Sequence, residues 1–293
     1  MSLRLEMLQV ARLAPTLLAE STPLVSAFVT RQQHAAGGFV DRSGQPDLYY
    51  TVFGLEGLAA VRADTPAARV RPFLESFGDG ADLDFVHLAC LARAWASLRD
   101  APNEDFRGRL ASRLAGFRSR DGGFNADAGA DEGTAYAAFV ALGAHQDLGA
   151  PVPDPDALAA SVRALDARDG GVSNLRGAAK GMTPPTAAAI AVLRQLDAPI
   201  PGSYVEWLLR HAHPQGGFVA GPGVPMPDLL STATAIHALV SMHASIDPLK
   251  EACLDFVDSL WNSRGGFHGH WADDEIDCEY TYYGLLALGH LSL

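Results

Sequence analysis

Apolar residues along the chain fall into two alternating kinds of segment. In the first kind they recur every three to four residues, and charged residues occupy the opposite face, as in an amphipathic helix. The second kind is apolar nearly all round and rich in Ala and Gly, which is typical of a helix buried on every side. The two kinds alternate from about residue 22 to the C-terminus, with short polar loops between them. The pattern predicts an all-α protein built from helical hairpins.

The amphipathic segments are predicted to be outer helices and the apolar segments inner helices. The predicted outer helices are Thr22–Gln33, Pro66–Phe77, Glu104–Arg118, Asp156–Ala167, Ser203–His213 and Pro248–Asn262. The inner helices align without gaps when they start at Asp47, Asp84, Asp131, Met182, Asp228 and Asp277. Since a carboxylate at a helix start accepts backbone N–H bonds and meets the positive end of the helix, we interpret these Asp residues first as N-caps.

Glycine doublets mark the turn between the two helices of each unit. They recur at intervals of 46 to 49 residues, except for one interval of 85 residues, in which Gly78-Asp79-Gly80 is a degenerate copy. The first Gly is predicted to end a helix in the left-handed conformation, and the second to let the chain reverse. The apolar residue that follows is predicted to pack back between helices. The doublets are Gly37-Gly38, Gly122-Gly123, Gly170-Gly171, Gly216-Gly217 and Gly265-Gly266, and the residues that follow them are Phe39, Phe124, Val172, Phe218 and Phe267.

Six such units predict a closed (α/α)6 toroid over residues 22–293, with an extra N-terminal helix within residues 1–21 that packs on it. That helix is predicted over Leu3–Leu18, from its apolar spacing. Closure would place all six inner-helix N-termini around one mouth. It would also make the last unit a neighbour of the first.

Composition and charge exclude several classes of function. The chain of 293 residues has a net charge of −12 and only two lysines, Lys180 and Lys250, which argues against duplex nucleic-acid binding and against a polybasic membrane anchor. Its three cysteines are far apart, which fits a reducing compartment, so we expect a cytoplasmic protein. We find no apolar run long enough for a transmembrane helix and no signal peptide.

The repeats resemble those of protein prenyltransferase β subunits and of squalene/terpene cyclases. Gly37 to Thr51 is especially similar to the prenyltransferase pattern GG-[LF]-x-D-[KR]-x-G-x-x-x-D-x-Y-H-T, and the resemblance covers about residues 22–293. It implies a funnel-shaped cavity for an isoprenoid or similar hydrophobic small molecule. Prenyltransferase β subunits work with a helical α subunit, and the sequence leaves open whether this chain needs a partner subunit.

The last repeat resembles the one that provides zinc ligands in the prenyltransferases as D-x-C. Asp277 is retained, but Glu279 stands at the Cys position and Cys278 comes one residue early. One residue along a helix rotates a side chain by about 100°, so Cys278 is no automatic substitute. Tyr50 stands where the family has His. The resemblance therefore makes Asp277, Cys278 and Glu279 candidate ligands of a zinc or magnesium ion, in an incomplete set.

The loop before this helix departs from the family's diphosphate site. Tyr280 matches the family's Tyr and His270 lies near its Arg position, but Asp273-Asp274-Glu275 stands near its Lys. These acids would repel a diphosphate unless a divalent cation lay between them. Together with Asp277 they read D-D-x-x-D, like the magnesium motif of class I terpenoid synthases. We interpret that match as coincidence, because here it spans a loop and a helix cap.

Three polar features outside this loop have a structural and a functional interpretation. His87 occupies the family's His position in the second unit, next to Asp47, and we favour a hydrogen-bonded inner-helix residue. His268 and His270 have a spacing compatible with a metal, and the loop from Arg176 to Lys180 could receive an anion. For both loops we favour solvent-facing residues.

The resemblance to squalene/terpene cyclases suggests a different chemistry. Cyclases of this kind use a D-x-D-D motif whose middle Asp protonates an alkene or epoxide. Asp82-Leu83-Asp84-Phe85 provides only D-x-D-F. Asp84 would then be the proton donor, without the partner that the last Asp supplies.

The leading prediction is a prenyltransferase-like protein that binds an isoprenoid or similar hydrophobic ligand in an apolar, aromatic funnel. Its expected chemistry is transfer of a prenyl group, with Asp277 and Tyr280 as the candidate catalytic residues. The alternatives are a non-catalytic ligand- or protein-binding toroid and a terpene cyclase that uses Asp84. The residues predicted to contact the ligand are Tyr49, Tyr50, Phe53, Tyr136, His270, Tyr282 and Tyr283, with Tyr280 also in the lining.

Overall fold

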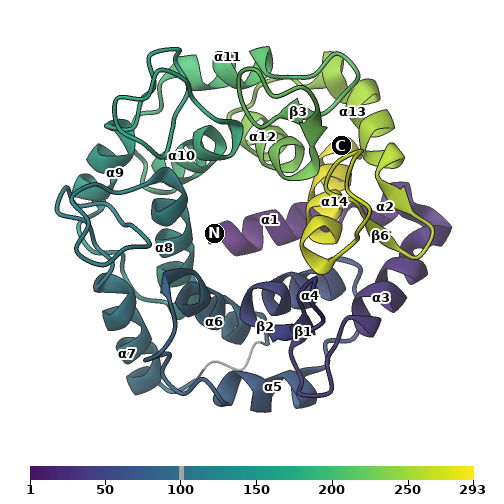
Figure 1. The fold of residues 1–293 in the computed structure, drawn as a ribbon, viewed down its shortest axis with the longest axis horizontal. Helices are drawn as coiled ribbons and strands as arrows, with labels where there is room; N and C mark the ends of the chain where they lie inside the picture. Colours follow the sequence, from purple (N-terminus) through teal and green to yellow (C-terminus); the bar gives the residue numbers. More distant parts are fainter. Residues whose placement is uncertain (99–101) are drawn as a thin grey trace.

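The inner helices form a closed ring in the computed structural model, which describes residues 1–98 and 102–293 (Figure 1). Consecutive inner helices pack side by side, and the last packs against the first. The predicted α/α toroid is therefore confirmed, including the contact between its first and last units. The inner helices are α4 (Leu48–Ala60), α6 (Phe85–Ser97), α8 (Ala135–Leu148), α10 (Thr183–Gln195), α12 (Leu229–Ser241) and α14 (Cys278–Leu291).

The outer helices surround this ring, and each ends two to four residues earlier than predicted. Except after α5, residues beyond the helix end instead pair with the chain at or after the glycine doublet, as in the bridges Gln33↔Phe39 and Arg118↔Phe124. Extended pairing there competes with the last helical turn. The outer helices are α3 (Thr22–Arg31), α5 (Ala67–Glu75), α7 (Glu104–Ala115), α9 (Pro155–Arg163), α11 (Gly202–Arg210) and α13 (Asp247–Ser259).

Three antiparallel pairs of short strands occur among the residues that the structure describes. β1 (Phe39–Val40) pairs with β2 (Pro46–Asp47), and β3 (Phe218–Val219) pairs with β4 (Pro227–Asp228). β5 (Trp261–Asn262) pairs with β6 (Gly266–Phe267). The first two pairs bring the residue after the glycine doublet next to the N-cap of the following inner helix, so each loop is held against the ring.

The glycine doublets lie in the turns closed by bridges such as Gln33↔Phe39 and Ala212↔Phe218, and not at helix C-termini, which corrects the predicted role of the first Gly. Its left-handed conformation is as predicted, with φ of +107° at Gly37 and +103° at Gly265. A Cβ at Gly265 would lie 2.1 Å from the carbonyl oxygen of Leu24 in α3. The last doublet thus packs directly on the first outer helix, and this close approach helps to close the ring.

The apolar residue after each doublet packs into the core, as predicted. Phe39 and Phe267 are buried, and each lies against a Gly of an inner helix, Gly54 and Gly284 respectively. The backbone N–H of Phe39 donates to Oγ1 of Thr51 (2.9 Å), whose hydroxyl donates to the N-cap carbonyl of Asp47 (2.6 Å). Three other units repeat this bond, with Thr186, Thr232 and Thr281 as the acceptors.

The third inner helix starts three residues later than the gapless alignment predicts. Its N-cap is Thr134, whose side chain accepts from the N–H of Ala137 (3.0 Å), whereas Asp131 pairs with Arg120 in the loop. Gly133 is held in that loop because its N–H donates to the Asp121 carboxylate (3.1 Å). Met182 likewise precedes α10 without a side-chain cap. Asp47, Asp84, Asp228 and Asp277 are N-caps, as predicted.

The N-terminal segment is two helices, not one: α1 (Leu3–Ala11) and α2 (Pro15–Leu18), followed by the 3-10 turn η1 (Ala19–Ser21). Pro15 interrupts the predicted helix because it has no N–H and its ring excludes the preceding helical turn. Helix α1 lies across the centre of the ring in Figure 1. Within the described ranges, we find no helix that is both long and apolar enough to span a membrane.

Helix α1 contacts the C-terminal ends of the inner helices. The N–H of Leu3 donates to Oε1 of Gln146 (2.8 Å) at the end of α8, and Nε of Arg12 donates to the carbonyl of Ala59 (3.2 Å) at the end of α4. Glu6 pairs with Arg194 near the end of α10. The ring is therefore covered by α1 at one end, and the inner-helix N-termini surround the other end.

Candidate ligand-binding cavity and its rim

The second residue after each N-cap faces the ring axis. These six residues form a layer just below the mouth: Tyr49, Val86, Tyr136, Pro184, Leu230 and Glu279. Five of them line the cavity, and Glu279 is bonded to one of those five. Because the helices run in the same direction, an equivalent register position reaches an equivalent depth.

The cavity has two adjoining lobes of about 100 and 120 Å³, with Met7, Tyr49, Tyr136, Phe139 and Tyr283 in the walls of both. Its walls are mainly apolar and aromatic. The centres of the Tyr49 and Phe53 rings are 4.9 Å apart, and those of Phe53 and Tyr283 are 5.6 Å apart. An apolar cavity with a few polar groups is the usual form of a small-molecule site.

Four of the predicted lining residues lie in the cavity wall: Tyr49, Phe53, Tyr136 and Tyr283. The others lie elsewhere. Tyr282 is fully buried next to Phe53, and Tyr50 packs against Tyr49. Tyr280 packs on Gly269, and His270 accepts the N–H of Ala272 within its loop.

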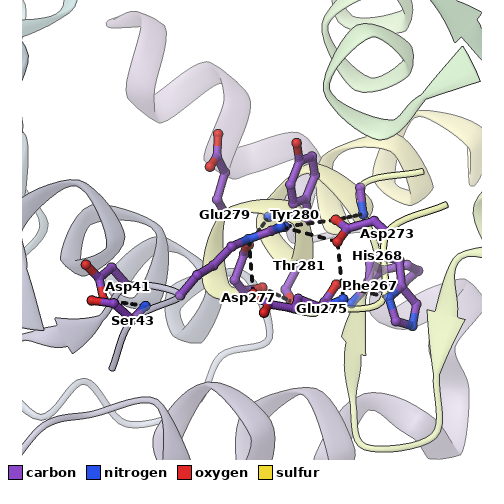
Figure 2. Close-up of polar contacts among 12 residues, drawn as sticks. Asp41, Ser43, Phe267, His268, Asp273, Glu275, Asp277, Glu279, Tyr280 and Thr281 are labelled. Atoms are coloured by element: carbon purple, nitrogen blue, oxygen red, sulfur yellow. Dashed lines mark hydrogen bonds and ion pairs between the residues drawn. The ribbon is translucent and has the colours of Figure 1, made fainter. Parts of the chain in front are cut away.

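Glu279 and Tyr49 form a hydrogen bond at the rim. The Tyr49 hydroxyl donates to Oε1 of Glu279 at 2.5 Å. Burial among aromatic rings raises the pKa of Glu279 to about 7, even though the bond from Tyr49 opposes the shift. Figure 2 shows Glu279 pointing away from the ion pairs around Asp277. Glu279 is therefore a carboxyl group that can gain or lose a proton near neutral pH beside an apolar cavity.

Asp277 has a different role, because Arg42 neutralises it. Nε of Arg42 donates to Oδ2 of Asp277 (2.7 Å), and Nη2 donates to Asp273 (2.9 Å). The Arg42 guanidinium also lies 5.3 Å from the centre of the Tyr280 ring. Burial raises the pKa of Asp277, while its bonds to the Tyr280 N–H and to Arg42 favour the charged form. Arg42 comes from the first unit and Asp277 from the last, so this pair joins the ends of the ring.

The predicted metal ligands do not fit a zinc or magnesium ion as they lie. Asp277 accepts from Arg42 and caps α14, and Cys278 is buried, with burial raising the pKa of its thiol. Glu279 points away from Asp277. Among residues 1–98 and 102–293 there is no cluster of three His, Cys, Asp or Glu side chains placed to hold a metal.

His87 lies between two carboxylates, as the hydrogen-bonded interpretation predicts. Its Nδ1 is 2.8 Å from Asp84 and its Nε2 is 3.0 Å from Asp47. The bond to Asp47 is the largest cause that raises the pKa of His87 to about 9. His87 in turn helps to lower the pKa of Asp84, against the effect of its burial. Asp84 is largely exposed, so its surroundings favour the charged form rather than a proton donor.

Sequence reasoning missed the polar residues at the closed end of the cavity. Arg4, Arg93 and Asp147 line it there, together with Met7 of α1. The sequence did contain an indication of these residues. Glu56, Arg93 and Asp147 are charged residues inside otherwise apolar helices, where a buried charge is costly unless it is paired. Their partners come from different helices, so their spacing along the chain is uninformative.

The fold is shared with known α/α toroid proteins. A sequence profile of the prenyltransferase alpha-alpha toroid domain matches residues 10–77 and 185–292. Protein geranylgeranyltransferase-I of Candida albicans, solved with GGPP, superposes with a TM-score of 0.71 and 17% identity over 92% of this chain and 90% of that one. No curated protein matches the sequence.

Two further solved structures are similar in fold. The type II terpene cyclase MstE of Scytonema has a TM-score of 0.62 and 11% identity, and covers 94% of this chain and 97% of its own. A protein from Actinoplanes has a TM-score of 0.58 and 14% identity, over 93% of this chain and 98% of that one. At these identities the likeness establishes the fold alone.

Proposed function

The chain belongs to the prenyltransferase alpha-alpha toroid domain family, and we propose that it binds an isoprenoid or a similar hydrophobic ligand in the cavity between its inner helices. The main support for this proposal is the cavity itself, whose two lobes share Tyr49, Tyr136, Phe139 and Tyr283 in their walls. Burying the apolar surface of a lipid there provides the main driving force for binding.

The structural neighbours support this ligand class. Candida albicans geranylgeranyltransferase-I is described in complex with GGPP, and a variant of MstE in complex with geranylgeranyl dihydroxybenzoate. Both ligands contain a C20 prenyl chain. In this chain Asp273 and Asp277 engage Arg42, so the basic group near the rim is already neutralised. The proposed ligand is therefore an uncharged isoprenoid in preference to a prenyl diphosphate.

Titration calorimetry with geraniol, farnesol, geranylgeraniol and the matching diphosphates tests the proposal. We expect saturable one-to-one binding of at least one alcohol, and weaker binding of its diphosphate. Ala188→Trp, which places an indole in the cavity wall, should reduce the affinity at least tenfold. Ala68→Trp, on the exposed face of α5, is the matched control and should bind normally. Binding that Ala188→Trp leaves unchanged would refute the proposed site.

A second candidate function is proton transfer to an alkene of the bound ligand, and the rim carboxyl favours it. Protonated Glu279 would donate its proton, a new C–H bond would form from the alkene π electrons, and a carbocation would remain. The nearby Tyr49 and Phe53 rings would stabilise that cation through their π faces. Loss of a proton from a neighbouring carbon back to the Glu279 carboxylate would complete an isomerisation or a cyclisation.

This candidate replaces Asp84 with Glu279 as the acid. Incubation with farnesol or geranylgeraniol in D₂O should place deuterium at an alkene carbon of the recovered ligand or its product. Glu279→Gln should abolish this incorporation, and Asp84→Asn should retain it. Incorporation that survives Glu279→Gln, or that vanishes only in Asp84→Asn, would exclude Glu279 as the acid.

A further inference from the structure

Four charged side chains meet at the closed end of the cavity. Nε of Arg4, in α1, donates to Oδ1 of Asp147, in α8, at 2.9 Å. Nη1 of Arg4 lies 3.7 Å from Oε1 of Glu56 in α4, and Nη2 of Arg93 in α6 lies 3.4 Å from Oε2 of the same carboxylate. We call these four residues the floor cluster. It brings two positive and two negative groups from four helices together in the interior.

The floor cluster reaches the cavity. Arg4, Arg93 and Asp147 form part of the wall of one lobe, alongside apolar residues such as Met7 and Phe53. Asp147 follows the rim residue Tyr136 by eleven positions on α8, a rise of about 16 Å along the helix. The cluster therefore lies at the opposite end of the cavity from Glu279, beyond a long apolar and aromatic stretch.

Hydrogen bonding within the cluster is incomplete. Oε2 of Glu56 and Nη2 of Arg93 are buried and lack a hydrogen-bond partner of good geometry. The side chain of Arg93 nevertheless keeps 20% of its surface accessible, and Arg93 lines the cavity. A buried guanidinium has five donors in a fixed plane, and unused donors in an apolar site are costly. A ligand oxygen in the cavity would accept from the part of the Arg93 guanidinium that remains accessible there.

We propose that Arg93 and Arg4, held in place by Glu56 and Asp147, bind an uncharged oxygen group, a hydroxyl or a carbonyl, at the end of the lipid that reaches the floor of the cavity. The inference rests on the proposed function, because it names the deep end of that same ligand. Few polar groups in an apolar cavity fix the direction in which a ligand enters. The ligand accordingly lies with a polar end at the floor and its hydrocarbon along the aromatic wall.

Charge balance favours an uncharged group over a carboxylate or a phosphate. Each arginine already faces a carboxylate, so a ligand anion would add an unmatched negative charge in a buried site. Burial also raises the pKa of Asp147, which indicates that this end of the cavity already disfavours negative charge. A neutral oxygen accepts from the guanidinium groups without disturbing either ion pair.

The floor cluster also attaches α1 to the ring, so the test must separate ligand recognition from a structural role. The probes are four compounds with the same farnesyl skeleton: farnesol, farnesal, farnesoate and the hydrocarbon farnesene. Their dissociation constants are measured by competition against one fluorescent prenyl probe. In the wild-type chain, farnesol and farnesal should bind at least tenfold more tightly than farnesene, and farnesoate more weakly than farnesol.

The test variant is the double substitution Glu56→Gln/Arg93→Gln. It removes both charges of this ion pair together, so that no buried charge loses its partner. The farnesol-to-farnesene affinity ratio should fall to threefold or less, while farnesene affinity stays within about twofold. Arg93→Lys, which retains the charge but not the planar fork, should give an intermediate ratio. Arg120→Gln, on an exposed loop, should leave the ratio unchanged. Circular dichroism and melting temperature establish that each variant is folded.

Several results would overturn the inference. The farnesol-to-farnesene affinity ratio could stay high in the folded double variant. It could instead be lost in Glu279→Gln, which would place the ligand oxygen at the rim. Farnesoate could also bind more tightly than the three uncharged compounds. If farnesol and farnesene bind equally well to the wild-type chain, the floor assignment fails and the proposed function stands. If none of the four compounds binds, the floor assignment fails, and the proposed function fails with it when geraniol and geranylgeraniol do not bind either.

Discussion

The hydroxyl of Tyr49 lies 2.5 Å from the carboxylate of Glu279, and this bond joins the first inner helix of the ring to the last. Residues separated by 230 positions in sequence are thus neighbours at the rim. The same seam contains the ion pairs between Arg42, Asp273 and Asp277. The contacts that close the ring therefore also form the rim of the candidate site.

Glu279→Gln should remove a pH dependence of stability. The pKa of Glu279 rises from an ordinary value of 4.5 to about 7, so the folded state binds more protons than the unfolded state between these values. The free energy of unfolding therefore falls as the pH rises from 4.5 to 7. Because Gln stays uncharged and can still accept from Tyr49, the variant should be about 1–2 kcal/mol more stable than the wild type at pH 8.

Urea unfolding of both proteins between pH 4 and pH 8 measures this effect. The two free energies should converge near pH 4, where Glu279 is protonated in both folded and unfolded chains. Parallel curves across the whole range would mean that Glu279 has an ordinary pKa.

Arg42→Met should weaken the seam of the ring. It leaves the buried carboxylate of Asp277 and its neighbour Asp273 without their positive partner. Since the Arg42 side chain is about one-third exposed, solvent moderates the loss, and we expect about 1–2 kcal/mol of destabilisation by denaturant unfolding. Arg120→Met, which breaks a fully exposed pair with Asp131, should change stability by less than about 0.5 kcal/mol. Equal effects of the two substitutions would contradict the special role of Arg42.

Gly265→Ala should be far more harmful than Gly44→Ala. Both residues have positive φ, at +103° and +82°, so both substitutions strain the backbone by about 1–2 kcal/mol. Only at Gly265 would the added Cβ meet a carbonyl oxygen of α3, 2.1 Å away, whereas Gly44 faces open space. The overlap should add at least about 2 kcal/mol to the cost, seen as a lower melting temperature. Similar melting temperatures would show that the doublet does not press on α3.

The repeat period predicted the architecture because each unit buries the same face. The inner helices are apolar nearly all round, and the apolar residue after each doublet packs into the core, as Phe39 and Phe267 do. Local details were less predictable. The gapless alignment misplaced the third helix start because Thr134 competes with Asp131 for the N-cap, and aligned letters do not show which residue folds into the loop.

The candidate site was predictable only in part, for a similar reason. The sequence predicted Tyr49, Phe53, Tyr136 and Tyr283 in the cavity wall, where they lie, but also Tyr50 and Tyr282, which are each one residue, or about 100° of helix rotation, away from a lining tyrosine. It did not predict that Arg42 would neutralise Asp277, because that contact depends on how the first and last loops meet. The acids that read as a metal motif therefore have an arginine as their counterion.

A crystal structure of the protein with geranylgeraniol tests the central claim most directly, because it locates the ligand rather than only detecting binding. We predict continuous density along the cavity between Tyr49, Tyr136, Phe139 and Tyr283. Density for the ligand only on the outer surface of the ring, or a cavity that holds only water at saturating ligand, would contradict the account.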